Sequence, residues 1–117
     1  CQSENNPYPD CAATYDESRL LSERLLQAFC KATGMQQLEI REMDNMTGTN
    51  WSKVPTTIVE MGFLSNKSDD MLMATNYFKE RAAEGIADGL DAYFTIVDAR
   101  AEADNSNASQ AGAAEEP

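Results

Sequence analysis

The chain has 117 residues and a formal net charge of −11, from 20 acidic and 9 basic side chains. This acidic balance excludes nucleic acid as a partner, because a row of phosphates needs many cations to neutralise it. Hydrophobic residues form 42% of the sequence, which is ordinary for one globular domain, and no apolar run is long enough to cross a membrane.

The first residue is Cys1 rather than Met, and the residues after it are polar, so we expect the sequence to be cut from a longer chain. The three cysteines match no metal-binding or redox spacing. Cys30 lies in an apolar helical pattern and is expected to be a small core residue, whereas a disulfide between Cys1 and Cys11 stays open. The sequence contains no histidine, so these residues alone cannot complete a His-bound metal site.

Residues 1–13 have the composition of a loop, and the first predicted helix covers residues 14–33. Thr14 followed by Glu17 forms a capping box, and Gly34 is a typical helix stop. The apolar side of this helix repeats at helical spacing and contains Leu21, Leu25, Ala28, Phe29 and Ala32.

Two short segments predict strands. Residues 38–42 are the weaker candidate, and residues 56–61 are β-branched and apolar on both faces, as in a strand buried in a parallel sheet. Between them, residues 44–53 have the composition of a turn around Trp51, and a Trp is more often a packing residue than a ligand platform. Arg41 is expected to be a surface or strand-end charge. The pattern predicts an α/β fold.

Glu60 is the most informative residue, because it places a carboxylate near the end of the apolar strand, just before Gly62 breaks that strand. In open α/β sheets, ligands and catalytic groups gather at the carboxyl ends of strands. A carboxylate there is costly without a partner or a task. The pattern alone leaves two alternatives open, a structural carboxylate and a functional site. We expect Glu60 to lie at the end of a central strand and to face an open cleft.

A Ser-Asn pair predicts the start of a short helix over about residues 67–75. Its first turn holds Asp69 and Asp70, two charges that are favourable against the helix dipole. Met71 and Met73 are expected to fill the core.

The last predicted helix is capped by Asn76. Gly85 and Gly89 would weaken an isolated helix, unless they permit close packing on a sheet. Residues 98–117 contain no large apolar side chain, so we predict a disordered acidic tail or linker there and a folded domain over residues 1–97. The apolar stripe of the helix recurs about every four residues, at Phe78, Ala82, Ile86, Leu90, Phe94 and Val97.

The segment Val54–Asp69 resembles the signature of the zinc-dependent N-acetylmuramoyl-L-alanine amidases of the Amidase_3 type. The shared pattern is Pro, a short apolar strand, Glu, any residue, Gly-Phe, any residue and Ser-Asn, and Glu60 occupies the glutamate position. The similarity covers about residues 7–95. Three flanking segments also resemble parts of the family in the same order: 17–23, 45–51 and 83–94.

This resemblance implies the C-terminal part of the catalytic domain of a cell-wall hydrolase. Such an enzyme cleaves the amide between N-acetylmuramic acid and the L-alanine of the stem peptide. The family fold implies three layers, with helices packed on a mostly parallel sheet whose N-terminal strands are missing here.

The resemblance also implies Zn²⁺ as the cofactor, held by His, Glu and His upstream of Cys1, so that no metal ligand is expected in this chain. Glu60 is implied as the catalytic residue that handles the proton of the zinc-bound water. Peptidoglycan is the implied partner of a monomeric enzyme that acts outside the cell, in the cell wall or in the periplasm.

The sequence also departs from the family pattern. Residues 36–40 replace the usual Asn-Arg-Gly-Val stretch, and Thr49 and Asn50 stand where many members carry Leu-Arg. Two other functions stay open: a non-catalytic module that keeps the scaffold and binds wall glycopeptide or a regulator, and a small acidic interaction domain with an accidental resemblance. An upstream open reading frame carrying the His, Glu and His ligands would favour the enzyme.

Overall fold

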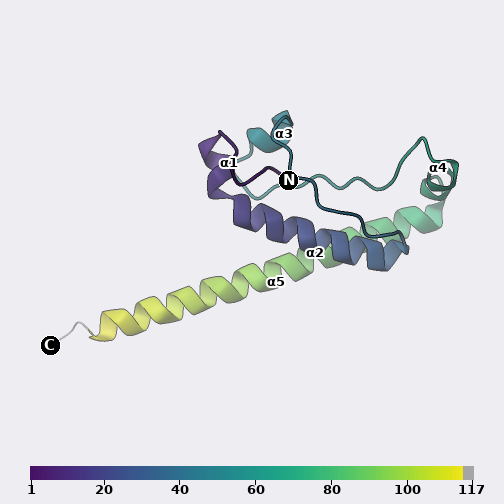
Figure 1. Cartoon of the computed structure of the whole chain (residues 1–117). Helices are drawn as coiled ribbons and strands as arrows, with labels where there is room; N and C mark the ends of the chain where they lie inside the picture. Colours follow the sequence, from purple (N-terminus) through teal and green to yellow (C-terminus); the bar gives the residue numbers. More distant parts are fainter. Residues whose placement is uncertain (115–117) are drawn as a thin grey trace.

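A computed structural model gives the structure of residues 1–114. The two long helices, α2 and α5, cross each other, α1 and α3 lie near the N-terminal end of α2, and α4 precedes α5 at the opposite end (Figure 1). The helices of this part of the chain are α1 (Pro9–Ala13), α2 (Tyr15–Thr33), α3 (Thr47–Asn50), α4 (Lys67–Met73) and α5 (Asn76–Ala114).

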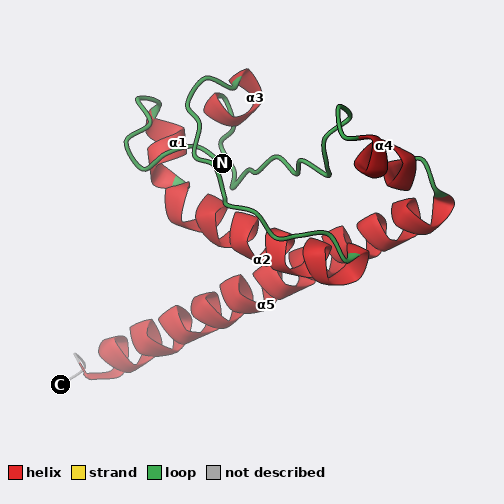
Figure 2. Cartoon of the chain, turned by 45° about the vertical axis from the view of Figure 1, so that its right-hand side comes forward, coloured by secondary structure: helices red, strands yellow, loops and turns green. Residues whose placement is uncertain are grey.

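The predicted three-layer α/β fold is wrong for residues 1–114, where every regular element is a helix and none is a strand (Figure 2). Residues 38–42 and 56–61, predicted as strands, lie in non-helical segments. A strand is stabilised by hydrogen bonds to a neighbouring strand. No backbone–backbone hydrogen bond within the described residues involves residues 36–40 or 57–62. These two segments have side chains that favour strands, but within the described residues neither has a neighbouring strand with which to form a sheet.

Helix α2 begins and ends close to the predicted residues. Gly34 follows it with a φ of 73°, a left-handed conformation that glycine adopts at low cost, and the Gly34 N–H donates to the Cys30 carbonyl at 2.9 Å. The predicted capping box is absent, because Thr14 makes no side-chain cap bond. Its hydroxyl donates instead to the Asp10 carbonyl, 3.0 Å away.

Helices α2 and α5 approach closely because two glycines lie at their crossing. A β-carbon at Gly85 would lie 2.8 Å from the Phe29 Cα, and one at Gly89 would lie 2.8 Å from the Leu25 Cα. Such distances are far shorter than van der Waals contact, so any side chain would push the helices apart. The two glycines permit close packing on a helix, not on a sheet as predicted.

The core lies along this crossing and joins both helices. The rings of Phe29 and Phe78 meet edge to face with centroids 6.2 Å apart, a favourable aromatic geometry. A second cluster places Tyr93 of α5 against α2. Val59, from a non-helical segment, packs against both clusters. The buried apolar side chains of α2 and α5 are Leu20, Leu21, Leu25, Phe29, Phe78, Ala82 and Tyr93.

Asp44 fastens the N-terminal segment to the rest of the chain. Its carboxylate accepts hydrogen bonds from the Ser3 hydroxyl, from the Ser3 N–H at 2.8 Å and from Asn6 Nδ2 at 2.7 Å. These bonds, that of the Ser3 hydroxyl first, lower the pKa of Asp44 below its ordinary value.

Helix α5 continues well beyond the predicted end of the last helix. Residues 98–114 are helical, and residues 98–113 are exposed, whereas a disordered tail was predicted there. The physical reason is composition, because this stretch is rich in Ala and contains no Pro before residue 117. The domain boundary at residue 97 stays a prediction, and residues 115–117 of the predicted tail lie outside the described part. Within residues 1–114, none of the helices has the length and apolar content that a bilayer crossing requires.

Candidate functional site

An open groove of about 980 Å³ lies between α2 and two non-helical segments of the chain. Leu25 and Phe29 of α2 line it together with residues from 34–43 and 57–63. Most of the lining side chains are apolar. The charged side chains among them are Glu39, Arg41, Glu60 and Asp69.

Glu60 lines this groove from the segment that joins α3 to α4, and its side chain is exposed. The segment alternates along its length, since Thr57 and Val59 are half-buried while Ile58 and Glu60 are exposed. Val59 reaches the core, so its neighbour faces away from the core. The predicted place of Glu60 at the end of a strand is wrong, because residues 1–114 form no strand. Its catalytic role stays a prediction.

Two serines of α2 hold the segment that carries Glu60. The Thr56 N–H donates to the Ser18 hydroxyl at 3.0 Å. One turn further along α2, the Ser22 and Thr57 hydroxyls lie in hydrogen-bond contact at 2.8 Å. Helix α2 therefore fixes the chain three to four residues before Glu60.

Sequence reasoning missed both serines as attachment points. Ser18 is completely buried and Ser22 nearly so, and their spacing of four residues places them on one face of the helix. This polar pair beside Leu21 and Leu25 was the available signal. Its partners lie more than thirty residues away in the chain, so their identity was not deducible from local pattern.

The predictions for the other residues singled out in the sequence have different outcomes. Trp51 is 75% exposed, so it does not pack as predicted. Arg41 is a surface charge, as one of its two predicted roles requires, and lies 3.9 Å from Glu39. Asp70 lies in the first turn of α4 as predicted. Met71 is 62% exposed and does not fill the core.

The described residues do not supply a metal site. All three cysteines are free thiols, so no bridge joins Cys1 to Cys11, and burial raises the pKa of the Cys11 thiol. Cys30 is half-buried against the core, as predicted. Among residues 1–114, no three His, Cys, Asp or Glu side chains gather closely enough to hold a metal ion.

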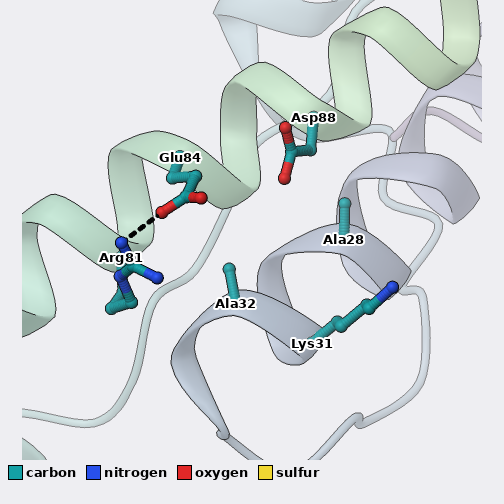
Figure 3. A pocket seen from close by; sticks show the side chains of 6 residues that line it. All are labelled: Ala28, Lys31, Ala32, Arg81, Glu84 and Asp88. Atoms are coloured by element: carbon teal, nitrogen blue, oxygen red, sulfur yellow. Dashed lines mark ion pairs between the residues drawn. The ribbon is translucent and has the colours of Figure 1, made fainter.

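A second, smaller pocket of about 460 Å³ lies at the crossing of α2 and α5 (Figure 3). Arg81 and Glu84 form an ion pair at 2.5 Å, and both side chains are exposed by 40% or more. Such surface pairs contribute little free energy. Lys31 and Asp88 complete a balanced set of charges, so this pocket selects neither anions nor cations, and the larger groove remains the candidate site.

Comparison with known proteins finds relatives for the part of the chain that contains most of the groove. Residues 9–92 match the family described as N-acetylmuramoyl-L-alanine amidase. The uncharacterized protein YqiI of Bacillus subtilis strain 168 is 25% identical over 79 residues, which are 68% of this chain and 38% of YqiI. The probable cell wall amidase LytH of Staphylococcus aureus is 26% identical over 81 residues, which are 69% of this chain and 28% of LytH. No solved structure matches the chain.

The chain therefore spans well under half the length of these curated relatives. The family match nevertheless extends from α1 into α5 and includes α2, the groove and the segment bearing Glu60. Because it covers most of the sequence, this chain belongs to the N-acetylmuramoyl-L-alanine amidase family.

Proposed function

We propose that this chain supplies the catalytic glutamate of a peptidoglycan amidase, which hydrolyses the amide between N-acetylmuramic acid and the L-alanine of the stem peptide. The observation that carries the proposal is that Glu60 lines an open groove within the region matched by the family. The likeness to LytH, a probable cell wall amidase, supports peptidoglycan as the substrate. The place of action would be the cell wall or the extracellular space.

Hydrolysis of an amide requires a group that takes a proton from the attacking water and returns one to the leaving nitrogen. A carboxylate performs both tasks. Glu60 would accept the proton as the water oxygen bonds to the carbonyl carbon. It would then donate that proton to the L-alanine nitrogen as the C–N bond breaks.

We further propose Zn²⁺ as the cofactor of the full-length protein. The described residues do not fit a complete zinc site, because they contain no cluster of three ligands and the sequence has no histidine. The resemblance to the family implies that these ligands lie upstream of Cys1, and we propose that they do. We therefore propose that the catalytic site is divided: this chain supplies Glu60, and another part of the protein supplies the metal ligands.

The test is Glu60→Gln in the full-length protein that carries this sequence. Glutamine keeps the size of the side chain but takes up no proton, so hydrolysis of purified peptidoglycan should fall by roughly two to four powers of ten. Release of stem peptides with a new L-alanine amine measures the reaction. Zinc content and melting temperature should change little.

The matched control is Glu80→Gln, which alters an exposed carboxylate of α5 outside the groove. It should retain full activity. Turnover close to that of the unmodified protein in Glu60→Gln would sink the proposed role and would favour a non-catalytic module that binds wall glycopeptide.

A further inference from the structure

Within the described part of the chain, hydrogen bonds hold the segment that carries Glu60 only at its ends, and between them Val59 packs against the core. No backbone–backbone hydrogen bond in residues 1–114 involves residues 57–62. The bonds of Thr56 and Thr57 to α2 hold the side that precedes Glu60. The direction of the Glu60 side chain therefore depends strongly on what holds the chain after it.

Asp69, in the first turn of α4, provides the attachment on that side. The Phe63 N–H donates to Asp69 Oδ2 at 3.2 Å. In return, the Asp69 N–H donates to Asn66 Oδ1 at 3.1 Å, and the Asn66 N–H donates to the Phe63 carbonyl at 3.0 Å. These three bonds join α4 to a tight turn that begins three residues after Glu60.

Packing at Gly62 supports the same attachment. A β-carbon at this position would lie 3.2 Å from Met73 Sδ and 3.3 Å from Met35 Cε. The backbone of Gly62 is thus held between the end of α4 and the residue that follows Gly34. These two side chains lie beside the backbone of Gly62, and the hydrogen bond from the Phe63 N–H to Asp69 adds a directional attachment next to it.

We propose that Asp69 is a positioning residue that orients Glu60 toward the groove, an inference that rests on the proposed function. Its carboxylate accepts the Phe63 N–H in a charge-assisted bond, so it holds the turn more firmly than a neutral acceptor would. In this role it acts on the reaction through the placement of Glu60. A catalytic group displaced by about 1 Å loses on the order of a hundredfold in rate.

The experiment is a double-mutant cycle in the full-length protein, with muropeptide hydrolysis as the readout. Asp69→Ala should lower kcat about tenfold to a hundredfold and leave KM nearly unchanged. Asp69→Asn, which keeps an acceptor oxygen but loses the charge, should recover part of the rate. The matched control is Asp70→Asn, which alters the neighbouring carboxylate in the same turn of α4 and should keep full activity.

The cycle separates positioning from general destabilisation. In the Glu60→Gln background, Asp69→Ala should cause no further loss, because no carboxylate remains to be placed. An equal loss in both backgrounds, or full activity of Asp69→Ala beside an inactive Glu60→Gln, would overturn the positioning role alone. An active Glu60→Gln variant would overturn the proposed function, and the inference with it.

Discussion

The hydroxyl of Ser18 joins three parts of the chain that are far apart in sequence. Its oxygen accepts a hydrogen bond from Gln2 Nε2 at 3.2 Å and another from the Thr56 N–H at 3.0 Å. Both acceptor positions of the hydroxyl are therefore used. Since Ser18 and Gln2 are both buried, water cannot replace either bond without opening the fold.

We expect Ser18→Ala to lower the free energy of unfolding of the 117-residue chain by about 1–3 kcal/mol, because it leaves the Thr56 N–H without its acceptor and removes one of the hydrogen bonds of Gln2 Nε2. Urea denaturation followed by circular dichroism measures the change. The control is Ser106→Ala, an exposed position on α5, which should alter stability by less than about 0.5 kcal/mol. Equal stability of the two variants would show that the Ser18 bonds contribute nothing.

At this scale the sequence was informative about Glu60 and uninformative about its supports. A carboxylate that follows an apolar β-branched run stands out from its neighbours, so Glu60 was found from pattern. Ser18 acts by accepting a hydrogen bond from the Thr56 N–H, and Asp69 acts by accepting one from the Phe63 N–H. Asp69 was predicted only as a charge that favours the helix dipole, because no pattern indicates that a side chain also accepts from a turn six residues earlier.

Among the elements, the crossing of α2 and α5 depends on the absence of side chains at Gly85 and Gly89. Their spacing of four residues places them on one face of α5, which the sequence already indicated. The prediction that they pack on a sheet was wrong, because a face with small residues can pack closely against either a helix or a sheet. Only the structure, which places Leu25 and Phe29 against that face, identifies α2 as the partner of the glycines.

Gly89→Ala should destabilise the chain although alanine favours helix by about 1 kcal/mol. The new β-carbon would lie 2.8 Å from the Leu25 Cα, which is backbone and cannot rotate away. Overpacking of this kind costs about 1–3 kcal/mol. Thermal denaturation of the 117-residue chain should show a lower midpoint.

The control for this substitution is Gly112→Ala, on the same helix, where the added carbon meets no described atom within 4 Å other than those of its own helix backbone. This variant should be neutral or slightly stabilising. A gain in stability at both positions would show that α2 and α5 do not approach each other as described.

The C-terminal part of α5 is open to solvent as far as residue 113. Residues 98–113 are all exposed, and isolated helices of this length are marginal in water. Removal of residues 98–117 should change the free energy of unfolding by less than about 0.5 kcal/mol. Limited proteolysis should cut within residues 98–117 first. If these residues resist the protease as well as residues 78–97 do, this expectation is wrong.

The strands were mispredicted for a reason that belongs to this scale. Val, Ile and Thr in residues 56–61 favour extended backbone, and the alternating exposure of residues 57–60 retains that character. A sheet, however, requires a second strand to accept and donate hydrogen bonds. Local preference is visible in the sequence, whereas the presence of a partner is not.

The whole molecule is more open than a compact domain of its size. Its radius of gyration is 18.3 Å, whereas a compact chain of this length has one of about 13 Å. Part of the difference comes from α5, which extends far past α2 (Figure 1). Several large apolar side chains are also exposed, among them Phe63, Leu64, Met71 and Phe94.

We expect the isolated 117-residue chain neither to retain zinc nor to release stem peptides from peptidoglycan. Zinc requires at least three protein ligands at about 2.0–2.3 Å, and residues 1–114 bring no such set together. Metal analysis after dialysis and a hydrolysis assay, both beside the full-length protein, test this expectation. Stoichiometric zinc with metal-dependent activity in the short chain would contradict the proposed division between Glu60 and the metal.

Helices α2 and α5 pack together but lie far apart in the sequence, and this has a consequence for synthesis. More than forty residues lie between the end of α2 and the start of α5. A ribosome that adds about 5–20 residues per second needs roughly 2–9 s to cross that interval. Meanwhile Leu25 and Phe29 face no helix, and their apolar side is open to a chaperone or to another nascent chain. The order of translation therefore sets the period in which this chain is most prone to aggregate.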